Sequence, residues 1–282
     1  MAQGVVPPPA LAVSAGRGKN YAKPILPNLG SIMILSERIK DLAPLSLRRL
    51  SRRLKAEIKA AGNRRLSARE AFTEVYTKGM WGGEPGTFFS GPGSNEAAAN
   101  PYADFVIRFM TERNIGSVVD LGCGDFRVGR LIVASGVSYT GVDVVEPLIA
   151  ENRQRYGGPS VRFQCADITS DALPDGELCL IREVFQHLSN AQVSAVLARL
   201  MKYTYVLITE VQPEEMKHYQ INRDKPHGAT SRIGHFSVLR LDQPPFNVDN
   251  VQTVFEIDPS YLASYKVYGG SFKLRTFLIS RA

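Results

Sequence analysis

The stretch "VVDLGCGDFRVG", residues 118–129, decides the fold. An apolar run ends at Asp120, and Gly122 and Gly124 follow with one residue between them. A short apolar run closed by glycines is typical of a buried strand that turns sharply into a helix. In an open α/β sheet, ligands bind beyond the carboxyl ends of the strands. We therefore expect Asp120 to face a ligand, with the backbone of Gly122 lying directly against it.

From Asn100 onward, helical and strand patterns alternate along the chain. Helical periodicity covers residues 102–114, 128–135, 147–156 and 190–202. Strand patterns cover residues 117–121, 138–142, 161–164, 177–181 and 203–209, with two late strands at 251–257 and 271–280. This alternation predicts an α/β fold, a doubly wound and mostly parallel sheet with helices on both faces. The two late strands are expected to pair as an antiparallel edge.

Two further acids close the next two predicted strands. Asp143 comes 19 residues after Gly124, at a strand end where a carboxylate can accept both hydroxyls of a ribose. Asp167 closes the following strand, where it can take an adenine amino group. A dinucleotide fingerprint would need a glycine at the position of Arg127, and Asp120 would repel a pyrophosphate. The pattern predicts a site for an adenosine without phosphates. The structural alternative is that these acids only cap loops and helices.

Together these segments resemble the class I S-adenosylmethionine-dependent methyltransferases. "VVDLGCGDFRVG" looks like their first motif, "TGVDVV" (140–145) their second and "CADI" (165–168) their third, while "LCLIREVFQHLS" (178–189) looks like the strand and turn that follow. The resemblance covers about residues 100–210 and implies a seven-stranded sheet with an antiparallel last strand. It implies S-adenosyl-L-methionine as cofactor, bound by Asp120, Gly122, Cys123, Gly124, Asp143, Val144, Asp167 and Ile168.

The segment after the fourth strand holds the candidate catalytic residues. Methyl transfer to an oxygen requires that the acceptor lose a proton, so a general base is plausible. His187 is the first candidate, because a neutral imidazole can accept a proton near pH 7. Glu183 and Asp125 are alternatives, and a histidine hydrogen-bonded to backbone is an equally good reading of His187. The histidines and cysteines show no metal-ligand spacing, so no metal is predicted.

Residues 72–94 are read as a loop of unusual composition. They contain six glycines, two prolines, the only tryptophan, Trp81, and four other aromatic residues. Gly-rich aromatic loops often close over ligands, so we expect residues 71–99 to form a lid that brings Trp81 to the cofactor. The alternative is that Trp81 packs in the core. The polar segment 212–247 is expected to be an insert on the substrate side.

The N-terminal part of the chain is strongly basic. Residues 1–70 hold 14 Lys and Arg against 4 Asp and Glu, a net charge of +10. We expect a disordered lead over residues 1–35, a basic amphipathic helix within 36–70, and the methyltransferase-like domain over 71–282. Leucines and alanine recur on one face of residues 44–61, which could dock on the domain or on an anionic membrane surface. Nucleic acid is a weaker candidate partner, because residues 31–71 contain no aromatic side chain for base stacking.

The sequence thus predicts methyl transfer to a hydroxyl of a small molecule, a sugar or a lipid-linked glycan. An RNA methyltransferase that uses the basic arm is the second reading, and a non-catalytic module recruited to membranes is the third. Cys123, Cys165 and Cys179 lack CxxC spacing, which fits a reducing compartment. No apolar run is long enough to span a membrane, and the first residues do not look like a secretory signal. We expect a cytoplasmic protein, with peripheral membrane binding through the arm as an open option.

Overall fold

The computed structural model describes residues 50–54, 56, 65–84, 86–258, 260–268 and 270–280. These belong to one compact unit, Ser46–Ala282. The predicted lead, residues 1–35, lies outside the described residues, as do residues 36–49 and 57–64 of the predicted basic helix. Residues 50–54 and 56 are helical, whereas residues 65–67 are not.

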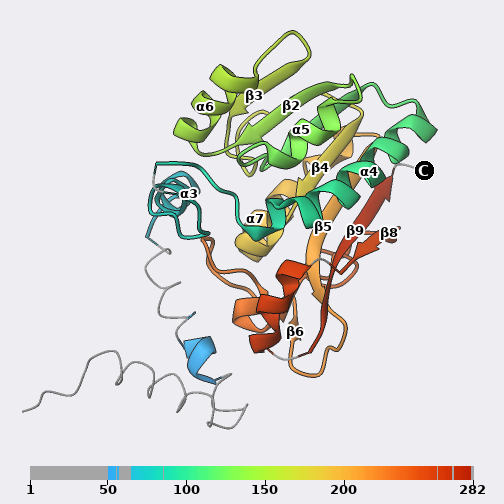
Figure 1. Cartoon of the computed structure of the whole chain (residues 1–282). Helices are drawn as coiled ribbons and strands as arrows, with labels where there is room; N and C mark the ends of the chain where they lie inside the picture. Colours follow the sequence, from blue (N-terminus) through green and yellow to red (C-terminus); the bar gives the residue numbers. More distant parts are fainter. Residues whose placement is uncertain are drawn as a thin grey trace, which may run out of the picture. The chain divides into compact units, whose positions relative to one another are not determined.

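Seven strands of the described chain form one sheet in the order β3-β2-β1-β4-β5-β9-β8 (Figure 1). The strands are β1 (Ser117–Leu121), β2 (Ser138–Asp143), β3 (Val161–Cys165), β4 (Leu178–Arg182), β5 (Tyr205–Pro213), β8 (Gln252–Ile257) and β9 (Phe272–Ser280). β1 to β5 pair in parallel, and β9 runs antiparallel to both β5 and β8. The predicted mostly parallel sheet with an antiparallel last strand is confirmed. The strand order reverses at β1 and β4, which is where open α/β sheets bind ligands.

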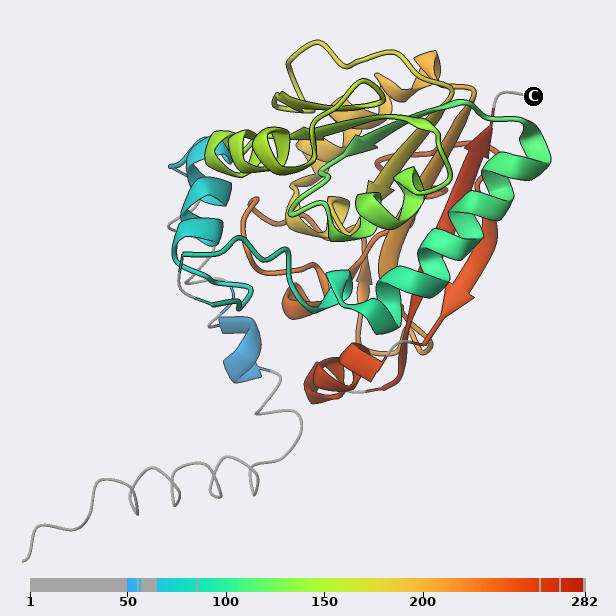
Figure 2. The ribbon, with the colours of Figure 1, turned by 45° about the horizontal axis from the view of Figure 1, so that its top comes forward.

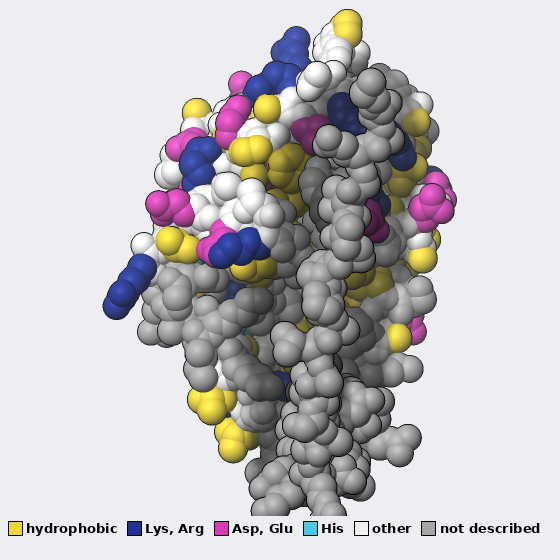
Figure 3. Space-filling view, turned by 60° about the vertical axis from the view of Figure 1, so that its left-hand side comes forward, with side chains coloured by type: hydrophobic (Ala, Val, Ile, Leu, Met, Phe, Trp, Pro, Cys, Tyr) yellow, Lys and Arg dark blue, Asp and Glu magenta, His cyan; other side chains and the backbone are white. Residues whose placement is uncertain are grey.

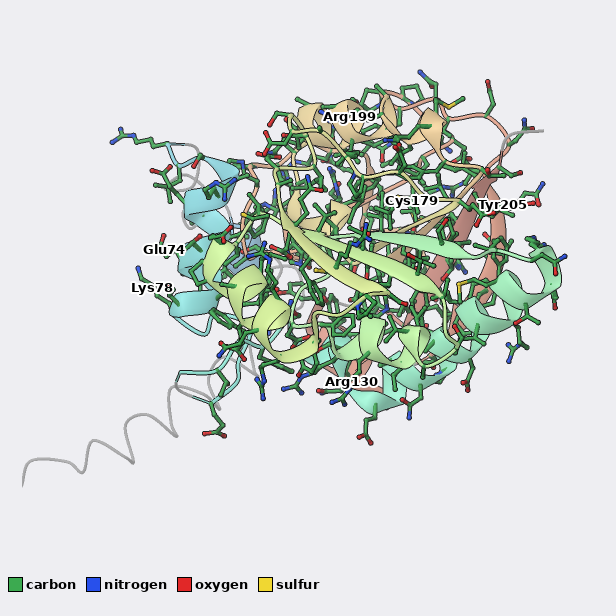
Figure 4. All side chains as sticks on the ribbon, turned by 90° about the horizontal axis from the view of Figure 1, so that it is seen from above. Glu74, Lys78, Arg130, Cys179, Arg199 and Tyr205 are labelled. Carbon is green, nitrogen blue, oxygen red and sulfur yellow. The ribbon has the colours of Figure 1, made fainter. Side chains whose placement is uncertain are left out.

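Helices cover both faces of this sheet. They are α3 (Ala68–Thr77), α4 (Glu96–Arg113), α5 (Arg127–Val133), α6 (Glu146–Tyr156) and α7 (Asn190–Leu197), with short 3-10 turns η1 (Pro92–Ser94), η2 (Phe185–His187), η3 (Leu200–Lys202), η4 (Ile233–His235) and η5 (Ser260–Tyr268). Figure 2 shows α4, α5 and α6 on one side of the strands. Figure 4 separates Arg130 of α5 from Arg199, just after α7, with Cys179 of β4 between them.

The core divides at the sheet because successive strand side chains point to opposite faces. Val118 and Leu180 pack with α4 and α5 in one apolar cluster, while Val119 and Ile181 pack with α7 in another. All four are buried. Strands covered on both sides read as continuous apolar runs, which is why the sequence predicts them closely.

The predicted bounds of the lid loop, residues 71–99, are wrong at both ends. α3 takes residues up to Thr77, and α4 takes those from Glu96. The helix start at Ser67 is a capping box: its hydroxyl accepts from the Glu70 N–H, and the Glu70 carboxylate accepts from the Ser67 N–H. On the outside of α3, Glu74 and Lys78 form an ion pair (Figure 4). The loop that remains runs from about residue 78 to 91.

The segment 212–247 is only partly irregular. β5 continues to Pro213, and a small two-stranded sheet joins β6 (Gln220–Ile221) to β7 (Ser237–Val238). The turn η5, between β8 and β9, was not predicted. Over the described ranges, no helix is both long and apolar enough to cross a bilayer.

Candidate active site

A cavity of about 570 Å³ opens at the carboxyl ends of the parallel strands. Its wall combines the loops after β1, β2, β3 and β4 with residues of α3, η1 and η5. Every residue that the sequence singles out for cofactor binding or catalysis lies on this wall: Trp81, Asp120, Gly122, Cys123, Gly124, Asp125, Asp143, Val144, Asp167, Ile168, Glu183 and His187. Residues far apart in the sequence therefore meet at one site.

The glycine loop after β1 is fixed to β2. The N–H groups of Gly122 and Cys123 donate to the Val142 carbonyl at 2.7 and 3.1 Å. Gly122 has φ +86°, and a Cβ there would lie 2.4 Å from Cγ2 of Val184. The sequence led us to expect a glycine here because the backbone lies close to the ligand, and this is only part of the reason. Val184 and the left-handed backbone already require a glycine before any ligand is considered.

Asp143 holds the loop and the next helix together. Its Oδ2 accepts from the Gly124 N–H at 3.2 Å, and its Oδ1 accepts from the Val145 N–H at 3.1 Å. Burial raises the pKa of Asp143 to about 6, and these backbone hydrogen bonds oppose the shift. The alternative reading, in which these acids cap loops and helices, thus describes part of what Asp143 does. Its place on the cavity wall, at the end of β2, also allows it to receive hydroxyl groups of a ligand.

Asp120 and Asp167 occupy the ends of two other strands. The Tyr139 hydroxyl donates to Asp120 Oδ2 at 2.6 Å, and burial raises the pKa of Asp120 to about 6. A buried carboxylate that is ionised at pH 7 can pair with a cationic group of a ligand. Asp167 Oδ1 accepts from both the N–H and the hydroxyl of Thr169, at 2.9 and 2.6 Å, so its side chain is held in a local turn.

Asp125 is tied to the loop before η1. The Ser90 N–H donates to Asp125 Oδ2 at 3.0 Å, and the Asp125 N–H donates to the Ser90 hydroxyl at 2.8 Å. The Tyr76 hydroxyl lies 2.9 Å from that same Ser90 oxygen, and Arg127 Nε lies 3.2 Å from Asp125. This network holds the Asp125 carboxylate in place on the cavity wall. Ser90 was missed from the sequence, where it is one polar residue among glycines.

Comparisons with known proteins agree with this arrangement. Residues 118–204 match a family model described as a methyltransferase domain. This match and the seven-stranded sheet identify a methyltransferase domain with the class I S-adenosylmethionine-dependent fold. No curated protein matches its sequence significantly. The fold is shared by the [4+2]-cyclase SpnF, with 12% identity over 76% of this chain and 97% of that chain and a TM-score of 0.50.

Two methyltransferase structures are also similar to this chain, with lower TM-scores. The 1,6-didemethyltoxoflavin-N1-methyltransferase of Burkholderia thailandensis is 17% identical, covers 80% of this chain and 91% of its own, and has a TM-score of 0.48. The magnesium protoporphyrin IX methyltransferase of Synechocystis is 12% identical, covers 77% of this chain and 100% of its own, and has a TM-score of 0.47.

The methyltransferase's cavity fits its cofactor, S-adenosyl-L-methionine, by the chemistry of the groups present. The cofactor supplies a methyl group on a sulfonium, together with an adenosine and an α-amino acid end. Acids at the ends of β1 and β2, and another just after β3, offer acceptors for its ammonium, its ribose hydroxyls and its adenine amino group. Within the described residues, no group of His, Cys, Asp and Glu has the arrangement of a metal site.

His187 is poorly suited to act as the base. Burial, and then the charge of Lys225, lower the pKa of His187 to about 3, so its imidazole is neutral at pH 7 but weakly basic. Because a carbonyl only accepts, His187 Nδ1 is assigned as the donor to Gly228 O at 3.1 Å. The Gly228 N–H in turn donates to the His187 carbonyl at 3.0 Å. His187 thus fastens the insert to the cavity wall, as the structural alternative proposes.

Glu183 presents a carboxylate to the same cavity. It follows β4 with φ +56°, a left-handed conformation that is uncommon for glutamate. The Tyr261 hydroxyl donates to Glu183 Oε1 at 3.0 Å, and Arg182 Nη1 lies 3.3 Å from Oε2. A Cβ at Gly93 would overlap this carboxylate, so η1 needs a glycine there. Glu183 is therefore held in place from three sides.

The cavity wall also contains residues that sequence reasoning missed. Tyr261, Tyr265 and Tyr268 of η5 line the cavity. Their spacing of four and three residues is a helical signal that would place them on one face. The insert contributes Ala229, Thr230 and Ser231.

Trp81 is part of the cavity wall in this structure. It is half-buried, its ring centroid lies 4.9 Å from that of His187 and 5.3 Å from that of Tyr76, and its Nε1 donates to Ala229 O at 3.1 Å. The residue therefore joins the loop after α3 to the insert. Whether it closes further over a bound cofactor stays a prediction.

Proposed function

We propose that this methyltransferase methylates a hydroxyl group of a small molecule, a sugar or a lipid-linked glycan. The observation that carries the proposal is the Glu183 carboxylate, fixed in the cavity wall by Tyr261 and Arg182. A hydroxyl must lose its proton as it becomes methylated, and a carboxylate within reach can take that proton. Glu183 replaces His187 as the candidate base because the imidazole is too weakly basic.

The size and lining of the cavity support an acceptor of limited bulk. A volume of about 570 Å³ lies within the range of roughly 300–1,000 Å³ found for sites that hold one drug-sized ligand. The cofactor occupies much of this space, so the acceptor is either small or inserts only one end. The hydroxyls and rings of Tyr261, Tyr265 and Tyr268 offer a surface that is both apolar and hydrogen-bonding.

A labelled-methyl assay tests the proposal directly. The full chain would be incubated with methyl-labelled S-adenosylmethionine and with phenols, sugars, lipid-linked glycans, amines and RNA, and products would be identified by mass spectrometry. We expect O-methylated product. Methylation of nitrogen only, or of RNA only, would overturn the proposed acceptor class, and the latter would support the RNA alternative.

Substitution of Glu183 tests the role of the carboxylate. Glu183→Gln should lower kcat by about 10²–10⁴-fold, the usual contribution of a general base, while S-adenosylhomocysteine affinity stays near that of the wild type. Glu177→Gln is the matched control, because Glu177 precedes the same strand at its opposite end, where its carboxylate accepts from the Gly116 N–H at 2.8 Å. Equal turnover in both variants would remove Glu183 from the mechanism.

A further inference from the structure

Tyr261 of η5 contacts both the cavity and the candidate base. Its hydroxyl donates to Glu183 Oε1 at 3.0 Å, and its side chain lines the cavity. The two residues are 78 positions apart, so the contact exists only because η5 meets the turn after β4 at this wall. Tyr261 is half-buried and keeps part of its surface open. A phenol oxygen can donate one hydrogen bond and accept another. The Tyr261 hydroxyl can therefore contact Glu183 and an acceptor at the same time.

The Tyr261 hydroxyl keeps its proton at pH 7. Burial, and then the charge of Glu183, raise the pKa of Tyr261 well above its ordinary value near 10. A phenol held in its neutral form is not a base by itself, and it can pass a proton on only by accepting one while it donates its own. Because the hydroxyl already donates to Glu183, the direction of such a transfer is from the cavity toward the carboxylate.

Glu183 is held at the receiving end of this contact. Its Oε2 lies 3.3 Å from Arg182 Nη1, and Gln186 Nε2 donates to its Oε1 at 3.4 Å. Gly93 packs so closely against the carboxylate that there is no room for a Cβ. The Glu183 side chain is only 13% exposed. A carboxylate fixed in this way keeps its place while a proton arrives, and the hydrogen bond from Tyr261 is a preformed route to it.

The α3 side of the cavity has a different chemistry. α3 contributes Ala68, Phe72 and Tyr76 to the wall, and the loop after it contributes Trp81. The Tyr76 hydroxyl is already hydrogen-bonded to Ser90, at 2.9 Å. Figure 3 brings forward the side of the molecule that carries α3, where hydrophobic side chains lie among charged ones. The α3 side therefore offers rings rather than proton acceptors, in contrast to the side built by β4 and η5.

We propose that Tyr261 is a second catalytic residue, which relays the acceptor proton to Glu183. This inference rests on the proposed hydroxyl acceptor. As the acceptor oxygen forms its bond to the methyl carbon, the methyl–sulfur bond breaks and its electron pair stays on sulfur. The acceptor proton passes to Tyr261 Oη, and the Tyr261 proton passes to Glu183 Oε1. The products are a methyl ether, S-adenosylhomocysteine and a protonated Glu183, which then returns the proton to water.

Tyr261→Phe tests the relay, because it keeps the ring and removes only the hydroxyl. Turnover of the full chain would be measured with the best hydroxyl acceptor of the labelled-methyl assay, and with an analogue that carries fluorine next to the hydroxyl. Fluorine makes the hydroxyl more acidic, so the analogue depends less on a base. With the parent acceptor, Tyr261→Phe should lower kcat by about tenfold to a hundredfold, around the lower end of the range for a general base. KM and S-adenosylhomocysteine affinity should stay near the wild type, and the loss of kcat should be smaller with the analogue.

Two other tyrosines serve as comparisons. Tyr203→Phe also loses a hydroxyl hydrogen bond, to the Pro174 carbonyl at 2.8 Å, but Tyr203 does not line the cavity, so its kinetics should match the wild type. Tyr265 shares the turn and the cavity with Tyr261, but it lies beside Ser231, and no hydrogen bond joins it to Glu183 among the described residues. Tyr265→Phe should therefore change KM and leave the ratio of kcat between the two acceptors as in the wild type.

Each failure of the relay has its own signature. If Glu183→Gln loses turnover and Tyr261→Phe does not, Glu183 takes the proton directly; the relay is then wrong and the proposed function stands. Equal losses with both acceptors would make Tyr261 a positioning residue and would also overturn the relay. Absence of any O-methylated product would overturn the proposed function and the relay with it.

A second substitution keeps the test decisive if Tyr261→Phe melts below the assay temperature. Incorporation of 3,5-difluorotyrosine at position 261 retains the ring and the hydroxyl but makes that hydroxyl more acidic. A relay through this hydroxyl should then give a different ratio of kcat between the two acceptors. A ratio equal to that of the wild type would count against the relay.

Discussion

The Tyr139 hydroxyl donates to Asp120 Oδ2 across two adjacent strands, at 2.6 Å. This hydrogen bond favours the ionised carboxylate, and it therefore lowers a pKa that burial has raised to about 6. The contact therefore influences the pH range over which Asp120 is ionised in the cavity.

Tyr139→Phe should therefore move the pH dependence of cofactor binding upward. Without the hydroxyl, the pKa of Asp120 rises further and more of it is protonated at pH 7, so affinity for S-adenosylmethionine falls there relative to the wild type. The difference between variant and wild type should narrow as the pH rises and Asp120 ionises in both proteins. Calorimetry from pH 5.5 to 9 measures the shift relative to the wild type. Tyr156→Phe is the control, because Tyr156 packs against Phe126 without a hydrogen bond to Asp120. Superimposable profiles for wild type and Tyr139→Phe would separate Asp120 from the binding step.

Gly122→Ala should destabilise the fold more than Gly136→Ala. Both glycines have similar φ values, +86° and +83°, so both substitutions bear the left-handed cost of roughly 1–2 kcal/mol. A Cβ at Gly122 also meets Val184, whereas nothing lies within 4 Å at Gly136. We expect Gly122→Ala to lose about 1–3 kcal/mol more, the usual cost of overpacking, as measured by urea unfolding. Adding Val184→Ala should restore part of it, and equal losses at the two glycines would contradict the packing argument.

The sheet and the assembly of the site were predictable because the sequence pattern of a buried parallel strand is visible within the strand itself. Strands buried on both faces are unbroken apolar runs, and their carboxyl ends meet at one edge, so acids at the ends of β1, β2 and β3 had to converge. α3 was missed because Phe72 and Tyr76 are weak helix formers close to Gly79. Ser67 and Glu70 nevertheless have the sequence pattern of a capping box, which marks the start of a helix.

Other features had no local signal. The low basicity of His187 comes from burial and from Lys225, which lies 38 positions later in the chain, and the carboxylate of Glu183 is fixed by Tyr261, 78 residues away. The lack of room for a Cβ at Gly122, caused by Val184, likewise depends on the spacing of two loops. Long-range packing decides these properties, and a single sequence does not display it.

Asp143→Ala should weaken S-adenosylmethionine binding by about 1.5–3 kcal/mol, the range for charge-assisted hydrogen bonds. The side chain also anchors the N–H groups of Gly124 and Val145, so part of this loss reflects a looser loop. Asp143→Asn keeps an acceptor for one of these N–H groups and should bind the cofactor more tightly than Asp143→Ala. Calorimetry measures both. Unchanged affinity in a folded Asp143→Ala protein would exclude this residue from the ribose site.

Glu210→Gln should stabilise the protein increasingly as pH rises. Burial, and then the charge of Glu183, raise the pKa of Glu210 to about 8, above the ordinary value near 4.5, while Arg232 opposes the shift. The protonated form is therefore favoured in the folded state, and its stabilising contribution is lost as pH rises toward 8. Between pH 4.5 and pH 8, the difference in free energy of unfolding between the variant and the wild type should grow by up to about 1.4 kcal/mol per pH unit. Thermal melts at pH 5, 7 and 9 without cofactor would show it; a constant difference would mean that Glu210 does not titrate in this range.

Trp81 reports on the cavity because it is the only tryptophan in the chain. Its ring is half-buried against His187 and Tyr76, and its Nε1 donates to Ala229 O at 3.1 Å. Saturating S-adenosylhomocysteine should change its emission, because the ring lines the space that the ligand enters. Trp81→Phe keeps an aromatic wall and loses only the indole hydrogen bond, about 1 kcal/mol of stability. Trp81→Ala opens the wall to water and should lower turnover much more than Trp81→Phe does. Emission that ignores the ligand, with equal turnover in the two variants, would mean that Trp81 only packs the loop after α3 against the insert and has no part in covering the cofactor.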